Sequence, residues 1–134
     1  MIELEGIDHV ALSVRDVEQS ARWYIEVLGF EHRWPGMWDG VPVFVGKGTT
    51  ALALFPSRGN VSDADTGRRG ARMLHIAFRT TRAGFAMAQQ DLQRRGIAFE
   101  FQDHEISQSI YFRDPAGHSV ELAPPTLWGG GWTF

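Results

Sequence analysis

The feature that most constrains the fold is an internal repeat. Residues 9–14 read HVALSV and residues 75–80 read HIAFRT, about half the chain apart. Self-similarity at this spacing indicates that one structural unit is used twice. With 134 residues, 43% of them hydrophobic, the chain has the size and composition of one ordinary globular domain. The two copies are therefore expected to be the two halves of a single domain.

Each copy of the repeat is followed by a helical pattern. Asp16 can cap a first helix that Gly29 ends, and Thr81 can cap a second that Gly96 ends. The apolar residues of these helices recur at helical spacing: Val17, Ala21, Tyr24 and Leu28 in the first, Phe85, Ala88 and Leu92 in the second. Short apolar runs at 30–34, 43–45, 50–55, 97–101, 109–112 and 118–123 predict the remaining strands.

Each half therefore reads β-α-β-β-β. We expect one domain over residues 1–134, with module one at about 5–56 and module two at about 71–123. The Gly-, Ser-, Asp- and Arg-rich stretch at 57–70 reads as an exposed connector. The tail, residues 124–134, holds Trp128 and Trp132 and is expected to pack on the domain's own rim or on a partner subunit.

Composition excludes several classes of partner and chemistry. A net charge of −3 gives no general attraction to nucleic acid or to an anionic membrane. The absence of cysteine removes disulfides, thiolate metal ligands and a cysteine nucleophile. The first residues do not resemble a signal peptide, and no apolar run is long enough to span a membrane. We therefore expect a cytoplasmic protein that acts on a small molecule.

Strand alternation places three potential metal ligands on one side of the predicted sheet. If the apolar residues of each strand face the helices, then His9, His75 and Glu121 face the other way. Two imidazoles and one carboxylate suit a divalent ion such as Fe, Mn, Ni or Zn, and they leave coordination positions open. A substrate would chelate the ion at these positions through neighbouring oxygens.

The sequence resembles the vicinal oxygen chelate superfamily, which includes glyoxalase I, bleomycin-resistance proteins, fosfomycin-resistance thiol transferases and extradiol dioxygenases. Three segments carry the resemblance: IDHVALSVRDVEQSARWYIEVLGF at 7–30, LHIAF at 74–78 and YFRDPAGHSVEL at 111–122. The resemblance implies an α+β fold, in which two βαβββ modules form an open, barrel-like mixed sheet with helices on the outer face. It also implies a homodimer, with His9, His75 and Glu121 at the metal positions.

Departures from the resembling enzymes separate the possible reactions. The strand at 50–55 lacks the additional glutamate ligand that glyoxalase I enzymes usually carry, which argues against a glyoxalase-like lyase or isomerase. Residues 101–106 lack the lysine of the fosfomycin-resistance enzymes, which argues against a thiol transferase that confers antibiotic resistance. Bleomycin-binding relatives typically lack metal ligands, whereas all three are present here.

The extradiol dioxygenase signature fits somewhat better, because His104 is followed after five residues by Ile110-Tyr111 and then by Asp114-Pro115. The leading hypothesis is a metal-dependent enzyme with dioxygenase-type chemistry, in which Tyr111 binds a metal-bound oxygen and His104 is an acid or base. The alternatives are a lyase or isomerase, a thiol transferase, and a non-catalytic drug-binding protein. Residues on the ligand face or near a pocket are the candidate substrate contacts: Ser13, Arg79 and Trp38.

Purely structural roles are the alternative for several of these residues. Tyr111 can equally be a strand aromatic that packs on its neighbours, and His104 can be an ordinary exposed loop residue. His118 reads as a turn residue, and His32 as a surface residue. The repeat is what raises His9 and His75 above a lone strand histidine, because both copies carry the residue at the same place.

Overall fold

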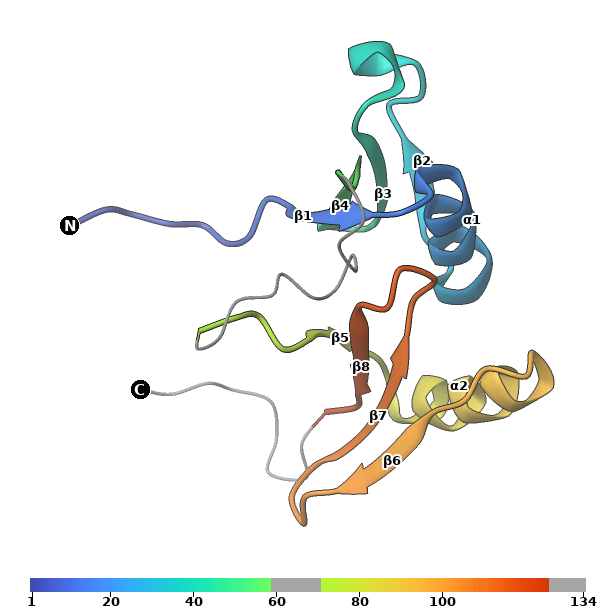
Figure 1. Cartoon of the computed structure of the whole chain (residues 1–134). Coiled ribbons are helices and arrows are strands. Elements are labelled where there is room, and N and C mark those ends of the chain that lie inside the picture. The colour runs from blue at the N-terminus through green and yellow to red at the C-terminus, as the bar shows by residue number, and fades with distance from the viewer. Residues whose placement is uncertain (59–70, 126–134) are drawn as a thin grey trace. The chain divides into compact units, whose positions relative to one another are not determined.

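The computed structural model describes residues 1–58 and 71–125. These residues form two compact units (Figure 1): unit 1 takes Met1–Ala71 together with Asp114–Gly117, and unit 2 takes the rest of the chain from Arg72. Most of the expected connector and of the tail, including Trp128 and Trp132, lies outside the described residues.

Unit 1 is a four-stranded mixed sheet with one long helix. Its elements are β1 (Val10–Val14), α1 (Val17–Leu28), β2 (Glu31–Arg33), the short 3-10 helix η1 (Met37–Gly40), β3 (Val43–Lys47) and β4 (Thr50–Pro56). The strand order is β1-β4-β3-β2, in which β1 runs parallel to β4 and the other pairs are antiparallel. Helix α1 is the crossover that parallel strands require, and it packs on β2, β3 and β4.

Unit 2 repeats this plan. Its elements are β5 (Ile76–Arg79), α2 (Arg82–Arg94), β6 (Glu100–Asp103), β7 (Gln108–Arg113) and β8 (Ser119–Ala123). The strand order β5-β8-β7-β6 matches that of unit 1, with β5 parallel to β8. The predicted pair of βαβββ modules is thus confirmed, and each module forms its own hydrogen-bonded sheet.

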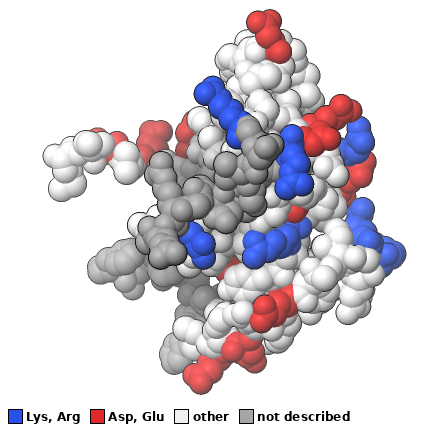
Figure 2. Space-filling view, viewed as in Figure 1, with Lys and Arg blue, Asp and Glu red and all other residues white. Residues whose placement is uncertain are grey.

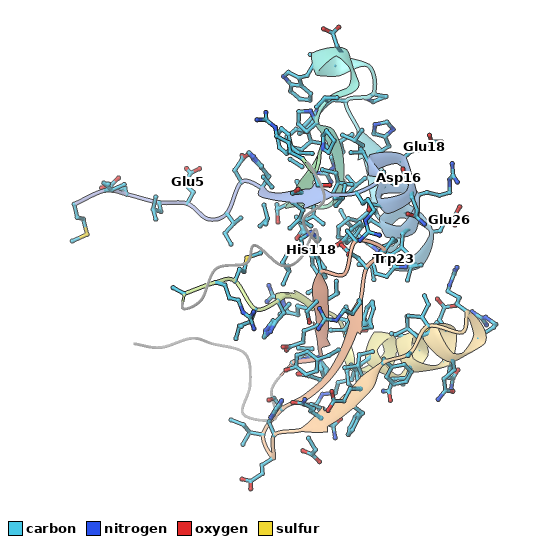
Figure 3. The ribbon with its side chains drawn as sticks, in the orientation of Figure 1. Glu5, Asp16, Glu18, Trp23, Glu26 and His118 are labelled. Carbon is cyan, nitrogen blue, oxygen red and sulfur yellow. The ribbon has the colours of Figure 1, made fainter. Side chains whose placement is uncertain are left out.

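The helix boundaries follow from local sequence signals. The Asp16 carboxylate accepts the Gln19 N–H at 3.0 Å, and the Thr81 hydroxyl accepts the Gly84 N–H at 2.9 Å, so both predicted N-caps are confirmed. Gly29 ends α1 in the left-handed conformation at φ 72°. Glu18 and Glu26 are exposed on α1 (Figure 3). Tyr24, on the opposite face of the same helix, is fully buried.

The predicted strand at 97–101 begins later than expected, at Glu100. The Ile97 N–H is bonded to the Leu92 carbonyl at 2.9 Å, and Gly96 has a φ of 72°. This is the six-to-one bond of a Schellman motif, which satisfies a carbonyl at the end of α2. The first apolar residues of the run therefore complete the helix end, and only the later ones pair in the sheet.

Burial confirms the predicted faces of the strands. Leu12 and Val14 on β1 are 2% and 0% exposed, while Ala11 and Ser13 are exposed. On β8, Val120 is 1% exposed and Glu121 is only half-buried. The histidine and glutamate positions therefore lie on the opposite side of each sheet from its core. No helix in the described part of the chain is long and apolar enough to cross a membrane.

A buried polar pair completes the core of unit 1. The Tyr24 hydroxyl donates to the Asp114 carboxylate at 2.7 Å, and both side chains are almost fully buried. Asp114 also accepts the Ala116 N–H at 3.0 Å within its own turn, and the Tyr24 bond attaches that turn to unit 1. Burial, with the Asp114 charge and hydrogen bond, raises the pKa of Tyr24 far above its usual value. Tyr24 is therefore a neutral donor that satisfies a buried carboxylate.

Candidate metal centre

Two of the three predicted metal ligands meet in unit 2. His75 immediately precedes β5, and Glu121 lies on the neighbouring strand β8. The His75 Nε2 and Glu121 Oε1 atoms are 3.1 Å apart, and the two side chains are 37% and 13% exposed. The pair is thus half-open to solvent on the face of the sheet away from its core.

This separation suits a shared divalent ion. Imidazole nitrogen and carboxylate oxygen bind such ions at about 2.1 Å, so two ligands at right angles are about 3.0 Å apart. Without an ion, the same two atoms attract each other through an imidazole N–H and the carboxylate. The donor types and their spacing therefore fit a divalent metal ion, which His75 and Glu121 would help to hold.

Two hydroxyl groups on β7 surround the same carboxylate. The Ser109 hydroxyl, 3% exposed, donates to Glu121 Oε2 at 3.0 Å. Tyr111 lies directly opposite Glu121 in the strand register, and its ring contacts His75 edge-on with centroids 5.6 Å apart. Burial raises the pKa of Tyr111, and its hydrogen bond to Glu121 raises it further. Ser109 holds one carboxylate oxygen, so the other is directed at His75.

His9 is held in unit 1 by two contacts. Its Nδ1 is 2.7 Å from the Asp8 carboxylate, and its ring meets Phe44 edge-on with centroids 5.3 Å apart. When neutral, an imidazole that donates from Nδ1 keeps the lone pair on Nε2. A carboxylate behind a histidine is a common way to orient such a ligand towards a metal. Asp8 therefore fits the role of an orienting partner for His9.

The two units place different side chains at corresponding positions. When His9 is matched to His75, the strand registers match Ala53 to Glu121 and Phe44 to Tyr111. Continuing the β3 register by one residue matches Pro42 to Ser109. Unit 1 therefore keeps the histidine and its edge-on aromatic ring but lacks the carboxylate and both hydroxyl groups. The predicted absence of a ligand on the 50–55 strand corresponds to Ala53, which is fully buried.

The remaining predicted site residues lie apart from this cluster or beside it. Ser13 on β1 and Arg79 on β5 are exposed on the same faces as the histidines of their own units. His104 is in the hairpin loop between β6 and β7, where its N–H donates to the Ser107 carbonyl at 2.7 Å. Three strand residues, about 10 Å, separate Tyr111 from the start of β7, so His104 is not beside Tyr111. Trp38 lies on η1 and contacts Phe44.

Sequence reasoning did not single out Ser109, Asp8 or Phe44. A signal for Ser109 was present, because Ser109 and Tyr111 are two residues apart on a predicted strand and so share a face. Asp8 and Phe44 had no such signal. Sequence spacing does not show that the Asp8 carboxylate bonds the His9 ring, nor that the Phe44 ring on another strand contacts it. Within residues 1–58 and 71–125, no group of three or more His, Asp or Glu side chains is placed to hold a metal ion. The His75–Glu121 pair is therefore the observed part of the candidate centre.

Two curated proteins are similar to this chain over most of its length. The chain is 27% identical over 121 residues to the glutathione transferase FosA of Serratia marcescens, covering 89% of this chain and 80% of that protein. It is 27% identical over 133 residues to the metallothiol transferase FosB of Staphylococcus epidermidis, covering 94% and 86%.

Solved structures share the fold. A lactoylglutathione lyase from Agrobacterium tumefaciens is 29% identical, with a TM-score of 0.70 and coverage of 94% of this chain and 98% of that one. A glyoxylase/bleomycin resistance protein/dioxygenase domain from Frankia is 27% identical, with a TM-score of 0.73 and coverage of 91% and 93%. A sequence model of the whole superfamily matches residues 6–122. The chain belongs to the glyoxalase/bleomycin resistance protein/dioxygenase superfamily.

Proposed function

We propose that this protein is a divalent-metal-dependent enzyme that joins a thiol to a small electrophilic substrate. The observation that carries the proposal is the approach of His75 Nε2 to Glu121 Oε1, at 3.1 Å, on an open sheet face. His9 is the proposed third ligand, because it occupies the strand position in unit 1 that His75 occupies in unit 2. A homodimer is expected, as the family resemblance implies.

The relatives favour thiol chemistry over the dioxygenase chemistry suggested by the spacing around His104 and Tyr111. Both curated relatives are described as transferases of glutathione or of another thiol, and the lyase structure is named for a glutathione substrate. The thiol transferase alternative is therefore preferred on the evidence of the relatives, even though residues 101–106 lack the lysine of the fosfomycin-resistance enzymes.

In the proposed reaction, a thiol adds to an electrophilic carbon that carries an oxygen leaving group. A C–S bond forms, the C–O bond breaks, and the thiol proton ends on the released oxygen. A bound divalent ion would supply Lewis-acid polarisation of that oxygen. Tyr111 is protonated at neutral pH, as tyrosines ordinarily are, and its hydroxyl can donate a hydrogen bond to an oxygen near Glu121.

The function is tested by incubating metal-loaded protein with glutathione and a panel of small epoxides and following thiol adducts by mass spectrometry. Turnover that requires both thiol and metal supports the proposal. The same protein is offered catechols in an oxygen electrode. Oxygen uptake without thiol adducts would overturn the thiol assignment in favour of the dioxygenase alternative.

Ser109 tests the carboxylate arrangement directly. Ser109→Ala removes the bond to Glu121 Oε2 and leaves Tyr111 as the remaining hydroxyl partner, so the carboxylate is held less firmly towards His75. We expect metal affinity to fall about 10-fold, at the lower end of the effect of losing such an orienting partner. Ser109→Thr keeps a hydroxyl and should restore most of the affinity. Equal affinity in the alanine variant and the unaltered protein, measured by competition with a fluorescent chelator, would show that Ser109 does not position Glu121.

A further inference from the structure

An aromatic cluster surrounds His9 in unit 1. The Phe44 ring lies 5.2 Å, centroid to centroid, from both Trp34 and Trp38, and 5.3 Å from His9. The two indole rings are 6.2 Å apart and nearly perpendicular, at 87°. Three aromatic side chains are therefore gathered beside a candidate metal ligand. We call Trp34, Trp38 and Phe44 the aromatic platform.

The platform is exposed. Trp34 and Trp38 are 54% and 51% exposed, and the neighbouring Met37 and Val41 are exposed to a similar extent. Figure 2 shows few charged side chains at the end of unit 1 that carries η1. Contiguous exposed apolar surface on a protein usually marks a binding site.

The backbone beneath the platform is held in an unfavourable conformation. Trp34, Trp38 and Asp39 have φ values of 50°, 55° and 54°, in the left-handed region that non-glycine residues rarely adopt. Such conformations persist where they position a functional side chain. The strained backbone at Trp34 and Trp38 places the two indole rings around Phe44, although both rings remain about half exposed.

The residues at corresponding positions in the two units differ around the platform. In unit 2, the counterpart of Phe44 is Tyr111, which lies among polar groups around Glu121. In unit 1, that polar set is replaced by Ala53 and Pro42, and aromatic side chains gather instead. The candidate ligand pair of unit 2 therefore lies among polar groups, whereas His9 in unit 1 has an aromatic cluster on one side and the Asp8 carboxylate at the Nδ1 nitrogen of its ring.

We propose that the aromatic platform binds a planar aromatic ring carried by the electrophilic substrate. This inference rests on the proposed function, and it names the substrate class as aryl-substituted electrophiles with an adjacent oxygen. Two indole rings at right angles can offer a ring both an edge and a face contact, which aromatic groups prefer over saturated ones. The contact between Phe44 and His9 would bring the ring's substituent towards a metal ligand.

Ring binding is measured first, without turnover. Benzyl alcohol and cyclohexylmethanol are uncharged probes of similar size that differ in aromaticity. Each is titrated into the protein while the tryptophan indole N–H signals are followed by NMR. We expect benzyl alcohol to shift the Trp34 and Trp38 signals and to bind about fivefold to tenfold more tightly than cyclohexylmethanol.

Matched variants localise the effect. Trp38→Leu should weaken benzyl alcohol binding by about fivefold or more. Trp23→Leu makes the same change on helix α1, where Trp23 packs against Tyr24, and should leave probe binding unchanged. Equal affinity for the two probes, or no loss in Trp38→Leu, would overturn the platform. The proposal would also be wrong if the platform only forms a contact with a second copy of the chain. In that case Trp38→Leu would dissociate the dimer, which sedimentation would detect.

Turnover then separates the two proposals. The protein is given glutathione with styrene oxide or with 1,2-epoxybutane, and adducts are quantified. A preference for styrene oxide that Trp38→Leu removes supports the platform. Adducts formed equally from both epoxides would overturn the platform and leave the thiol transfer standing. Ring binding without adducts from any epoxide would instead count against the proposed function.

Discussion

Replacing His75 with alanine should leave the protein folded and remove its bound divalent metal. His75 supplies one of the two donor atoms that approach each other at 3.1 Å, and its half-open position means that little core packing is lost. Loss of a direct ligand should weaken binding at least about 100-fold, since loss of an orienting partner alone costs up to that much. Elemental analysis after dialysis should show about one ion per chain in the unaltered protein and almost none in the variant.

A matched control shares the residue type but not the position. His104→Ala also removes an imidazole, in this case from the β6–β7 loop, and should keep its metal. Thermal unfolding of both variants checks that neither has lost the fold. If His75→Ala retained its full metal content, the assignment of His75 and Glu121 as ligands would be wrong.

Replacing Tyr24 with phenylalanine should destabilise the protein by about 2 to 3 kcal/mol, because a buried carboxylate loses a hydrogen-bond donor. Tyr24 is 0% exposed and Asp114 is 4% exposed, so water does not readily replace the lost hydroxyl. Denaturant unfolding at neutral pH gives the change in the free energy of unfolding. A double-mutant cycle with Asp114→Asn should show that the two changes are not additive.

The pH dependence provides a second readout for the same residue. The pKa of Tyr24 is raised in the folded protein, whereas an unfolded tyrosine titrates near about 10. The unfolded chain therefore loses a proton that the folded chain keeps, so stability falls as pH rises above about 10, by up to about 1.4 kcal/mol per pH unit from this group. Tyr24→Phe should flatten this alkaline slope, leaving Tyr111 as the remaining tyrosine. An unchanged slope would contradict the buried pair.

The sequence predicts the element order well because the signals are local. The caps at Asp16 and Thr81, the glycine at the end of α1 and the apolar periodicity each depend on a few neighbouring residues. The strand at 97–101 shows the limit, since Ile97 is apolar but its N–H completes the end of α2. Apolar periodicity predicts which side chains are buried, but it does not predict which carbonyl accepts a given backbone N–H.

The sequence proposes the three candidate ligands, but it does not predict the side chains that surround them. The repeat identifies His9 and His75, and strand alternation adds Glu121. The Ser109–Glu121 bond and the ring contacts of Phe44 depend on the register between strands. Register is set by the whole sheet, so these contacts appear only when the strands are paired. The neighbours of the two histidines, polar in unit 2 and aromatic in unit 1, likewise depend on the register between strands.

The bond between Tyr24 and Asp114 also bears on how the chain folds as it is synthesised. The two residues are 90 positions apart, and Asp114–Gly117 belongs to unit 1 although it follows β7 in the sequence. The first half of the chain therefore leaves the ribosome before the carboxylate partner of Tyr24 has been made, and it gains these core residues only after β7 has been synthesised. The two units share one strand order, yet the first cannot complete its core until most of the second has been synthesised.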